Sequence, residues 1–250
     1  MTSTANRWLT HRQARTNARL RLFCLPYAGG GASAYYGWEK DLPGDIELYA
    51  LQLPGREERY QEAPFTQVEP LIQTLGPLLQ PYLDRPFALF GHSMGALIAF
   101  ELARYWRREY QLLPAHLFVS AIRAPQSLYK DAPISQFTDE QFIEQVVGRY
   151  NAVPEAILND REYMRLLLPT MRADFGMIET YAYQQEEPLA CPIATFGGKA
   201  DKAVPLRGLM AWKEQTKDDF SLRLFNGGHF FLREERGFLL ELIKNLLQDS

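Results

Sequence analysis

The chain has 250 residues, of which 46% are apolar and 23% are charged, and its formal net charge is −3. This composition is that of an ordinary globular protein with ample apolar material for a core, and the length fits one domain spanning residues 1–250. The small net charge argues against a nucleic-acid-binding surface, and no apolar run approaches the length of a membrane span.

An arginine-rich tail comes first in the chain. It could serve as a docking arm for an acidic partner, but we expect a solvated and partly frayed terminus. The tail lacks the apolar core of a secretory signal, so we expect a cytoplasmic protein. Its basic residues are Arg7, Arg12, Arg15, Arg19 and Arg21.

Six short apolar runs then predict strands. Most are nearly continuous rather than alternating, which indicates a sheet covered on both faces. Helical patterns lie between several of them, so we predict an α/β protein with a mostly parallel, doubly wound sheet and helices on both faces. The runs are Leu20–Leu25, Ile46–Leu51, Phe87–Phe90, His116–Ala121, Ile193–Phe196 and Ser221–Phe225.

The two cysteines, Cys24 and Cys191, lie in or beside these predicted strands. Two cysteines make no disulfide framework, and no metal-ligand spacing is present. We therefore expect two buried free thiols and no metal site.

The sequence Gly91-His92-Ser93-Met94-Gly95 has the form G-x-S-x-G, directly after a predicted strand and before a helical pattern. A turn this sharp forces strained backbone at the serine, and side chains two residues to either side would collide. Glycines remove those side chains and leave the serine hydroxyl at a helix N-terminus, where a developing anion is favoured. We predict Ser93 as a nucleophile.

About 70 residues separate the fourth and fifth long runs, too many for a single crossover helix. Thr138 and Gln141 have the spacing of a capping box, and Pro154 is placed to open a short helix at its first turn. A third helical pattern follows, which Pro169 should kink. We predict a helical lid insertion at about residues 126–185 over the ends of the strands.

A serine hydroxyl needs a base to take its proton, and the chain has four histidines. His11 lies in the tail, His92 should point to the other side of the turn, and His116 opens a strand at the far end of the sheet. His229 follows the last strand on a loop, in the final place of the chain order Ser, Asp or Glu, His. We predict His229 as the base.

The acid should lie on a loop after a strand, between the serine and the base. Asp201 does so, after Ile193–Phe196, and we predict that it orients the imidazole. The remaining aspartates weighed for this role fall in the insertion or before a strand. They are Asp131, Asp139, Asp160, Asp174, Asp218 and Asp219.

An oxyanion hole needs two N–H donors. One should be the amide of Met94, and the other should come from the glycine-rich loop after the first strand, where we choose Ala28 with Tyr27 as the near alternative. Neither G-x-x-x-x-G-K-[ST] nor G-x-G-x-x-G is present, so this loop is not expected to bind a nucleotide.

Together these residues resemble the type II thioesterases, stand-alone enzymes of polyketide, nonribosomal peptide and fatty acid synthesis within the α/β-hydrolase superfamily. The resemblance covers nearly the whole chain. One departure is Tyr27, where the family commonly has histidine. The motifs are residues 25–30 (LPYAGG), 53–57 (LPGRE), 91–95 (GHSMG), 123–125 (RAP), 168–169 (LP), 172–175 (RADF), 197–198 (GG) and 228–232 (GHFFL).

The resemblance implies an α/β-hydrolase fold and hydrolysis of acyl groups held as thioesters on the phosphopantetheine arm of an acyl or peptidyl carrier protein. It implies editing or product release through an acyl-Ser93 intermediate, with no cofactor. We expect a monomer that binds neither nucleic acid nor membrane. Two alternatives remain: a carboxylesterase or lipase acting on small esters with the same triad, and a catalytically silent carrier-binding protein.

Other side chains near these motifs stay open between roles. Arg56 and Arg59 follow the second strand and could contact an acidic carrier or the pantetheine phosphate, but local ion pairs with Glu57, Glu58 or Glu62 are the better expectation. For an acyl pocket, lining and ordinary packing are equally expected of four apolar side chains: Met171, Phe175, Phe230 and Phe231.

Overall fold

The computed structural model describes residues 7–10, 15, 17–128, 133–150, 153 and 155–248, with the side chains of residues 155 and 156 left aside. His11, Arg12, Asp131 and Pro154, which carried expectations from the sequence, lie outside these ranges, so the predicted helix opening at Pro154 stays a prediction.

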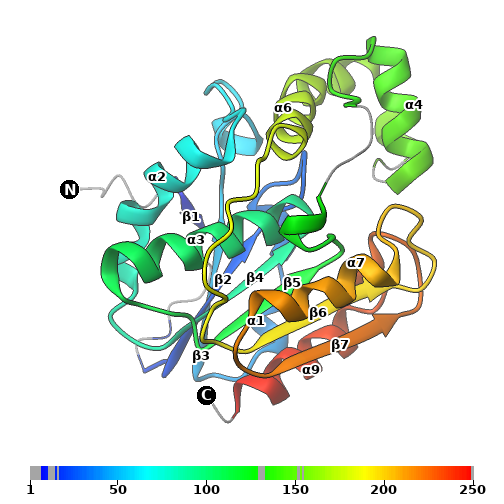
Figure 1. Ribbon diagram of the computed structural model, residues 1–250. Coiled ribbons are helices and arrows are strands. Elements are labelled where there is room, and N and C mark those ends of the chain that lie inside the picture. Colours follow the sequence, from blue (N-terminus) through cyan, green and yellow to red (C-terminus); the bar gives the residue numbers. More distant parts are fainter. Residues whose placement is uncertain are drawn as a thin grey trace.

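A seven-stranded sheet forms the centre of the protein, in the order β1-β3-β2-β4-β5-β6-β7 (Figure 1). Every neighbouring pair is parallel except β1 with β3. This confirms the predicted mostly parallel α/β architecture. The strands are β1 (Leu9–Thr10), β2 (Leu20–Leu25), β3 (Ile46–Leu51), β4 (Phe87–His92), β5 (His116–Ser120), β6 (Ile193–Gly198) and β7 (Phe220–Phe225).

All six predicted strands are present, and β2 and β3 have the predicted bounds. β4 is two residues longer than expected because its hydrogen bonding with β5 continues to His92, up to the residue before Ser93. No sequence pattern predicted β1, because its two residues are too few for a hydrophobic period and depend on pairing with β3.

Helices cover both faces of the sheet because strand side chains alternate between them. Phe23 and Leu25 of β2 point toward the helices at residues 68–79 and 94–110, whereas Leu22 and Cys24 point toward those at residues 38–41 and 236–247. The α-helices are α1 (Trp38–Asp41), α2 (Val68–Leu79), α3 (Met94–Tyr110), α4 (Asp139–Tyr150), α5 (Glu155–Leu158), α6 (Arg161–Glu179), α7 (Leu206–Met210), α8 (Phe231–Glu234) and α9 (Arg236–Leu247). Short 3-10 helices occupy Ala32–Tyr35, Glu57–Arg59, Gln80–Tyr82, Pro125–Ser127 and Ala211–Gln215.

Helices α4, α5 and α6 form the segment between β5 and β6, with α4 and α6 standing beyond the sheet (Figure 1). They share a separate apolar core that includes Phe142 and Phe175. The capping box is confirmed: the Thr138 amide donates to the Gln141 side chain over 3.3 Å, and the Gln141 amide donates to the Thr138 hydroxyl over 3.4 Å. α6 contains Pro169 within a single helix, and the predicted kink at this residue stays a prediction.

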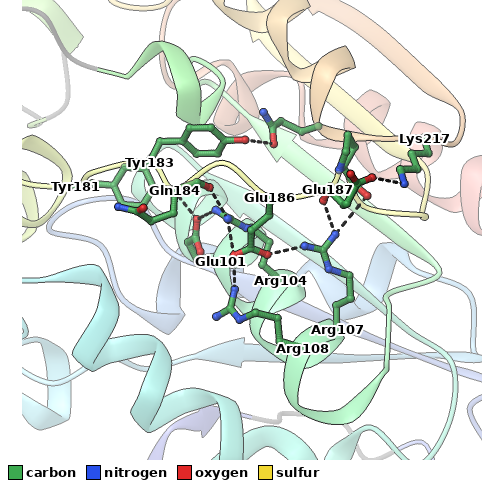
Figure 2. A network of polar contacts seen from close by, with 12 residues as sticks. Glu101, Arg104, Arg107, Arg108, Tyr181, Tyr183, Gln184, Glu186, Glu187 and Lys217 are labelled. Atoms are coloured by element: carbon green, nitrogen blue, oxygen red, sulfur yellow. Dashed lines mark hydrogen bonds and ion pairs between the residues drawn. The ribbon is translucent and has the colours of Figure 1, made fainter.

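A polar network holds residues 180–192, the connector from α6 to β6, against α3 (Figure 2). The Glu186 carboxylate lies 2.6 Å from Arg104 and Arg107 and 2.7 Å from Arg108. These arginines are three and four residues apart, so they lie on one face of the helix. The end of the predicted insertion is therefore fixed to the helix that begins beside Ser93.

The arginine-rich tail differs from expectation. Arg19 forms an ion pair with Asp45 at 2.7 Å, Arg21 is a buried partner of Glu47, and Arg15 donates to main-chain carbonyls in and before β3. The prediction of a solvated, frayed tail is thus wrong for these three arginines, because Arg21 lies within the interior strand β2 and Arg15 and Arg19 bond to residues in or beside β3.

Both cysteine thiols lie in the protein core. Cys24 and Cys191 are buried free cysteines, as predicted. Burial raises the pKa of the Cys191 thiol to about 12 and that of Cys24 well above its ordinary value. No helix in the described part of the chain combines the length and apolarity needed to span a bilayer.

Candidate active site

Ser93 occupies the single residue between the end of β4 and the start of α3. Its backbone has φ 52° and ψ −120°, a region that a residue with a side chain rarely adopts. The Ser93 amide donates to the Ser120 carbonyl over 2.7 Å, which ties the turn to the neighbouring strand β5. The surrounding sheet therefore holds the serine in a strained conformation.

The two glycines of this turn are required by contact with backbone atoms. A Cβ on Gly91 would lie 2.2 Å from the Gly95 oxygen, and one on Gly95 would lie 2.0 Å from the Leu25 oxygen. Neither backbone neighbour can rotate away as a side chain can. The collision argued from the sequence therefore has specific partners, and at Gly95 the partner is strand β2.

Asp201 and His229 come from the loops that follow β6 and β7. Asp201 Oδ2 lies 2.8 Å from His229 Nδ1, and Asp201 Oδ1 accepts from the Ala203 amide at 2.9 Å. Both side chains are at most 3% exposed. Because a carboxylate accepts at Nδ1, that nitrogen carries the ring proton, and Nε2 is the nitrogen able to take another.

Ser93 and His229 line one cavity of about 300 Å³ at the strand ends, together with Ala28. Phe175 and Tyr150 line it from the helices between β5 and β6. A nucleophilic hydroxyl, an imidazole oriented by a buried carboxylate and an apolar wall are the parts needed for acyl transfer. The structure thus brings the three predicted catalytic side chains to one place from three separate loops.

The predicted oxyanion donors flank the same site. Met94 is the first residue of α3, and Ala28 lies in the loop that follows β2. Within the described part of the chain, neither amide donates a hydrogen bond to another protein group. Tyr27, the alternative donor, also lines the cavity, and its ring packs edge-on against Phe230 at 4.8 Å between centroids.

His92 differs from expectation in one respect. It does not line the cavity, but its ring is fully buried and lies 5.3 Å from the His229 ring, centroid to centroid. Its Nδ1 lies 2.8 Å from the Ser120 hydroxyl. Burial, followed by the nearby His229, lowers the pKa of His92 well below its ordinary value, so this ring stays neutral and packs against His229.

Arg56 and Arg59 are both only 5% exposed, so they do not form a surface for an acidic carrier. Arg59 pairs with Glu62 at 2.6 Å, one of the local partners expected from the sequence. Arg56 instead forms a two-pronged ion pair with Asp174 of α6, at 2.8 Å for each contact. Sequence reasoning missed this pair because its members lie 118 positions apart.

The four aromatic or apolar pocket candidates divide into three groups. Phe175 and Phe230 line the cavity with Ser93. Met171 instead lines a second hollow of about 430 Å³, which residues of the Tyr27–Gly31 loop also line. Phe231 is core, stacked on Phe225 with centroids 4.7 Å apart.

The part of the chain that the structure describes contains no cluster of metal-ligating side chains. No group of three or more histidine, cysteine, aspartate or glutamate side chains lies close enough there to hold an ion. The carboxylate nearest the candidate base, that of Asp201, is fully engaged with His229 and two main-chain amides.

Comparison with known proteins gives a consistent result. The model of the thioesterase domain family matches residues 20–247. The chain is 45% identical over 241 residues to the gramicidin S biosynthesis protein GrsT of Aneurinibacillus migulanus, covering 96% of this chain and 94% of that protein.

Solved structures agree. One is the type II thioesterase BorB from the borrelidin biosynthetic cluster, with a TM-score of 0.89 and 35% identity over 99% of this chain and 100% of that one. The thioesterase RedJ from the prodiginine pathway of Streptomyces coelicolor has a TM-score of 0.88 and 36% identity, over 94% and 92% of the two chains.

Proposed function

This chain belongs to the type II thioesterase family and has its α/β-hydrolase fold, and we propose that it hydrolyses acyl thioesters carried on the phosphopantetheine arm of an acyl or peptidyl carrier protein. The observation that carries the proposal is the cavity shared by Ser93 and His229, with Asp201 bonded behind the imidazole. Relatives named for gramicidin S, borrelidin and prodiginine synthesis support a role beside a peptide or polyketide synthase, in editing or product release.

Acylation begins at the Ser93 hydroxyl. His229 Nε2 takes its proton as the oxygen attacks the thioester carbonyl, while Asp201 stabilises the imidazolium through Nδ1. The amides of Ala28 and Met94 donate to the oxyanion. The carrier thiol then leaves with the proton returned by His229, and it is an easier leaving group than an alcohol because thiols are far more acidic than alcohols.

Deacylation uses the same groups with water in place of the serine. His229 takes a proton from water as the water oxygen attacks the acyl-Ser93 carbonyl. The ester C–O bond then breaks, His229 returns the proton to Ser93 Oγ, and the carboxylic acid departs. The apolar wall contributed by Phe175 and Phe230 supports an acyl occupant of the cavity.

The helices between β5 and β6 are the moving part in this proposal. We propose one domain, residues 1–250, in which residues 126–185 form a cap that opens to admit the pantetheine arm. The separate apolar core of α4 and α6 supports motion as a unit. Hydrogen exchange should show faster exchange in the cap than in β4, with a change on adding acyl carrier protein. Equal protection of cap and sheet, with and without carrier, would count against it.

The remaining assignments are tied to this role. A carrier-dependent enzyme works where its synthase works, so we place it in the cytoplasm. We propose that it acts as a monomer, without nucleic acid, membrane, metal or cofactor. Gel filtration with light scattering checks the oligomeric state, and a stable dimer would overturn that assignment.

The test compares hydrolysis of acyl carrier protein thioesters with hydrolysis of matched oxygen esters. We expect a strong preference for the carrier thioester, and a strong preference for oxygen esters would favour a carboxylesterase instead.

Ser93→Ala should fold normally and lose turnover, whereas Ser221→Ala, the same change at an exposed strand position, should leave turnover unchanged. A fluorophosphonate probe should label the wild type but not Ser93→Ala. An unlabelled wild type would point to a silent carrier-binding protein.

A further inference from the structure

We propose that Asp174 and Arg56 are positioning residues that hold the oxyanion loop, Tyr27–Gly31, in its working conformation, and that Asp174 does so only while α6 is in place. The inference rests on the proposed function, because it assigns the Ala28 amide to the oxyanion hole. Neither side chain lines the cavity that contains Ser93.

Asp174 connects α6 to the loop directly. Its Oδ2 accepts from the Gly29 amide at 2.7 Å and from Arg56 Nη1 at 2.8 Å, while Oδ1 accepts from Arg56 Nη2 at 2.8 Å. The carboxylate has no exposed surface. A charged acceptor shielded from water binds an amide more strongly than an exposed or neutral one does.

Arg56 fixes the next residue of the same loop. Its Nη1 also donates to the Gly30 carbonyl at 3.0 Å, and its Nε donates to the Pro54 carbonyl at 3.3 Å. The pair therefore contacts the loop twice: Asp174 holds an N–H at Gly29, and Arg56 holds a C=O at Gly30. One buried ion pair thus orients the Ala28–Gly29 peptide through its N–H and the Gly30–Gly31 peptide through its C=O.

The loop conformation itself depends on α6. Gly29 has φ +75°, and a Cβ there would lie 2.9 Å from the Met171 side chain. Met171 and Asp174 are three residues apart and lie on the same face of α6. One helix face thus supplies both the packing surface and the hydrogen-bond acceptor for the residue that follows Ala28.

The position of the Gly29 peptide sets the orientation of the Ala28 amide. The Ala28 amide precedes Gly29 by one residue, so a shift of the Gly29 peptide reorients the Ala28 donor. An oxyanion donor is effective only within about 2.7–3.1 Å of the oxyanion. When α6 moves away, Asp174 leaves the loop and Arg56 loses its partner. The oxyanion hole is complete only with α6 seated, so hydrolysis is coupled to closure of the cap.

The test measures the hole separately from substrate binding. The variants are Asp174→Asn and Arg56→Lys, and the measured quantities are kcat, KM and the affinity for a trifluoromethyl ketone. The adduct of this ketone with Ser93 places an oxyanion in the hole. We expect kcat and ketone affinity to fall about ten- to a hundredfold, part of the loss seen when a whole oxyanion donor is removed. KM should change less than threefold.

The matched control is Glu186→Gln, which disrupts a partly buried ion-pair network between α3 and the connector after α6 (Figure 2), and Glu186 pairs there with Arg104, Arg107 and Arg108 rather than with the loop. It should lower stability yet keep wild-type ketone affinity. If Asp174→Asn and Arg56→Lys fold and bind the ketone as the wild type does, the inference is wrong. If Asp174→Asn fails to fold, Arg56→Lys decides alone.

Failure of the proposed function looks different. In that case the wild type itself shows no fluorophosphonate labelling and no thioester turnover, and no variant comparison arises. An active wild type with an unaffected Arg56→Lys variant rejects the positioning role while leaving the thioesterase assignment in place.

Discussion

At Gly95 the start of α3 lies against strand β2, and enlarging that residue should separate the helix from the sheet. In Gly95→Ala the new Cβ would lie 2.0 Å from the Leu25 oxygen, 2.6 Å from the Leu25 carbonyl carbon and 2.7 Å from the Pro26 oxygen. Cβ atoms essentially never lie within 3.0 Å of such neighbours. The N-terminus of α3 must therefore move about 1.0 Å (3.0 − 2.0) away from β2.

The loss in unfolding free energy follows from the need to move the backbone of α3 away from β2. Overpacking a core usually costs about 1–3 kcal/mol, and backbone collisions belong at the upper end of that range. Replacing a helical glycine by alanine returns at most about 1 kcal/mol. We therefore expect Gly95→Ala to lose about 2 kcal/mol of unfolding free energy. Because Met94 and Ser93 move with the helix start, kcat should fall as well.

Urea unfolding followed by circular dichroism measures this loss, with Gly176→Ala as the matched control. Gly176 is also helical, but its added Cβ would make only an ordinary contact, 3.7 Å from the Ser135 hydroxyl oxygen. That variant should be about 0.5–1 kcal/mol more stable than the wild type. If Gly95→Ala unfolds at the wild-type urea concentration, the argument that backbone contact dictates this glycine is refuted.

Three further predictions concern single side chains. Asp201→Asn should lower kcat by about 10⁴-fold with little change in stability, because the amide stabilises the wrong imidazole tautomer; steady-state kinetics would show this, and activity near wild type would contradict it. Burial lowers the pKa of His116 from 6.5 to about 4, so the unfolded chain binds this proton first and stability falls by about 3 kcal/mol as the pH drops from 6.5 to 4. His116→Phe keeps the stacking on Phe118 and should remove the contribution of His116 to the difference in unfolding free energy between pH 8 and pH 5. An unchanged pH dependence of the unfolding free energy would contradict this. Thr138→Ala should destabilise α4 by about 1 kcal/mol, measured by hydrogen exchange, since it removes the helix cap; unchanged exchange would show that the cap contributes nothing.

Local patterns in the sequence determined most of the fold and the identity of the candidate catalytic side chains. Continuous apolar runs predicted the parallel strands because both faces of such a sheet are buried, and a glycine two residues to each side of Ser93 predicted the turn because its sterics are local. Chain order then selected Asp201 and His229, since parallel strands place the loops after β6 and β7 at the same edge as Ser93.

Contacts between distant segments were decided by the tertiary structure alone. In the sequence Asp174 was one of the aspartates assigned to the predicted insertion, and Arg56 was expected to form a local ion pair with a neighbouring glutamate. Their pairing with each other and with the Gly29 amide depends on how α6 docks over the loop after β2. The strand β1 and the contact of His92 with His229 are of the same kind. Periodicity reports which face of an element is buried, but the partner across that face is chosen by packing.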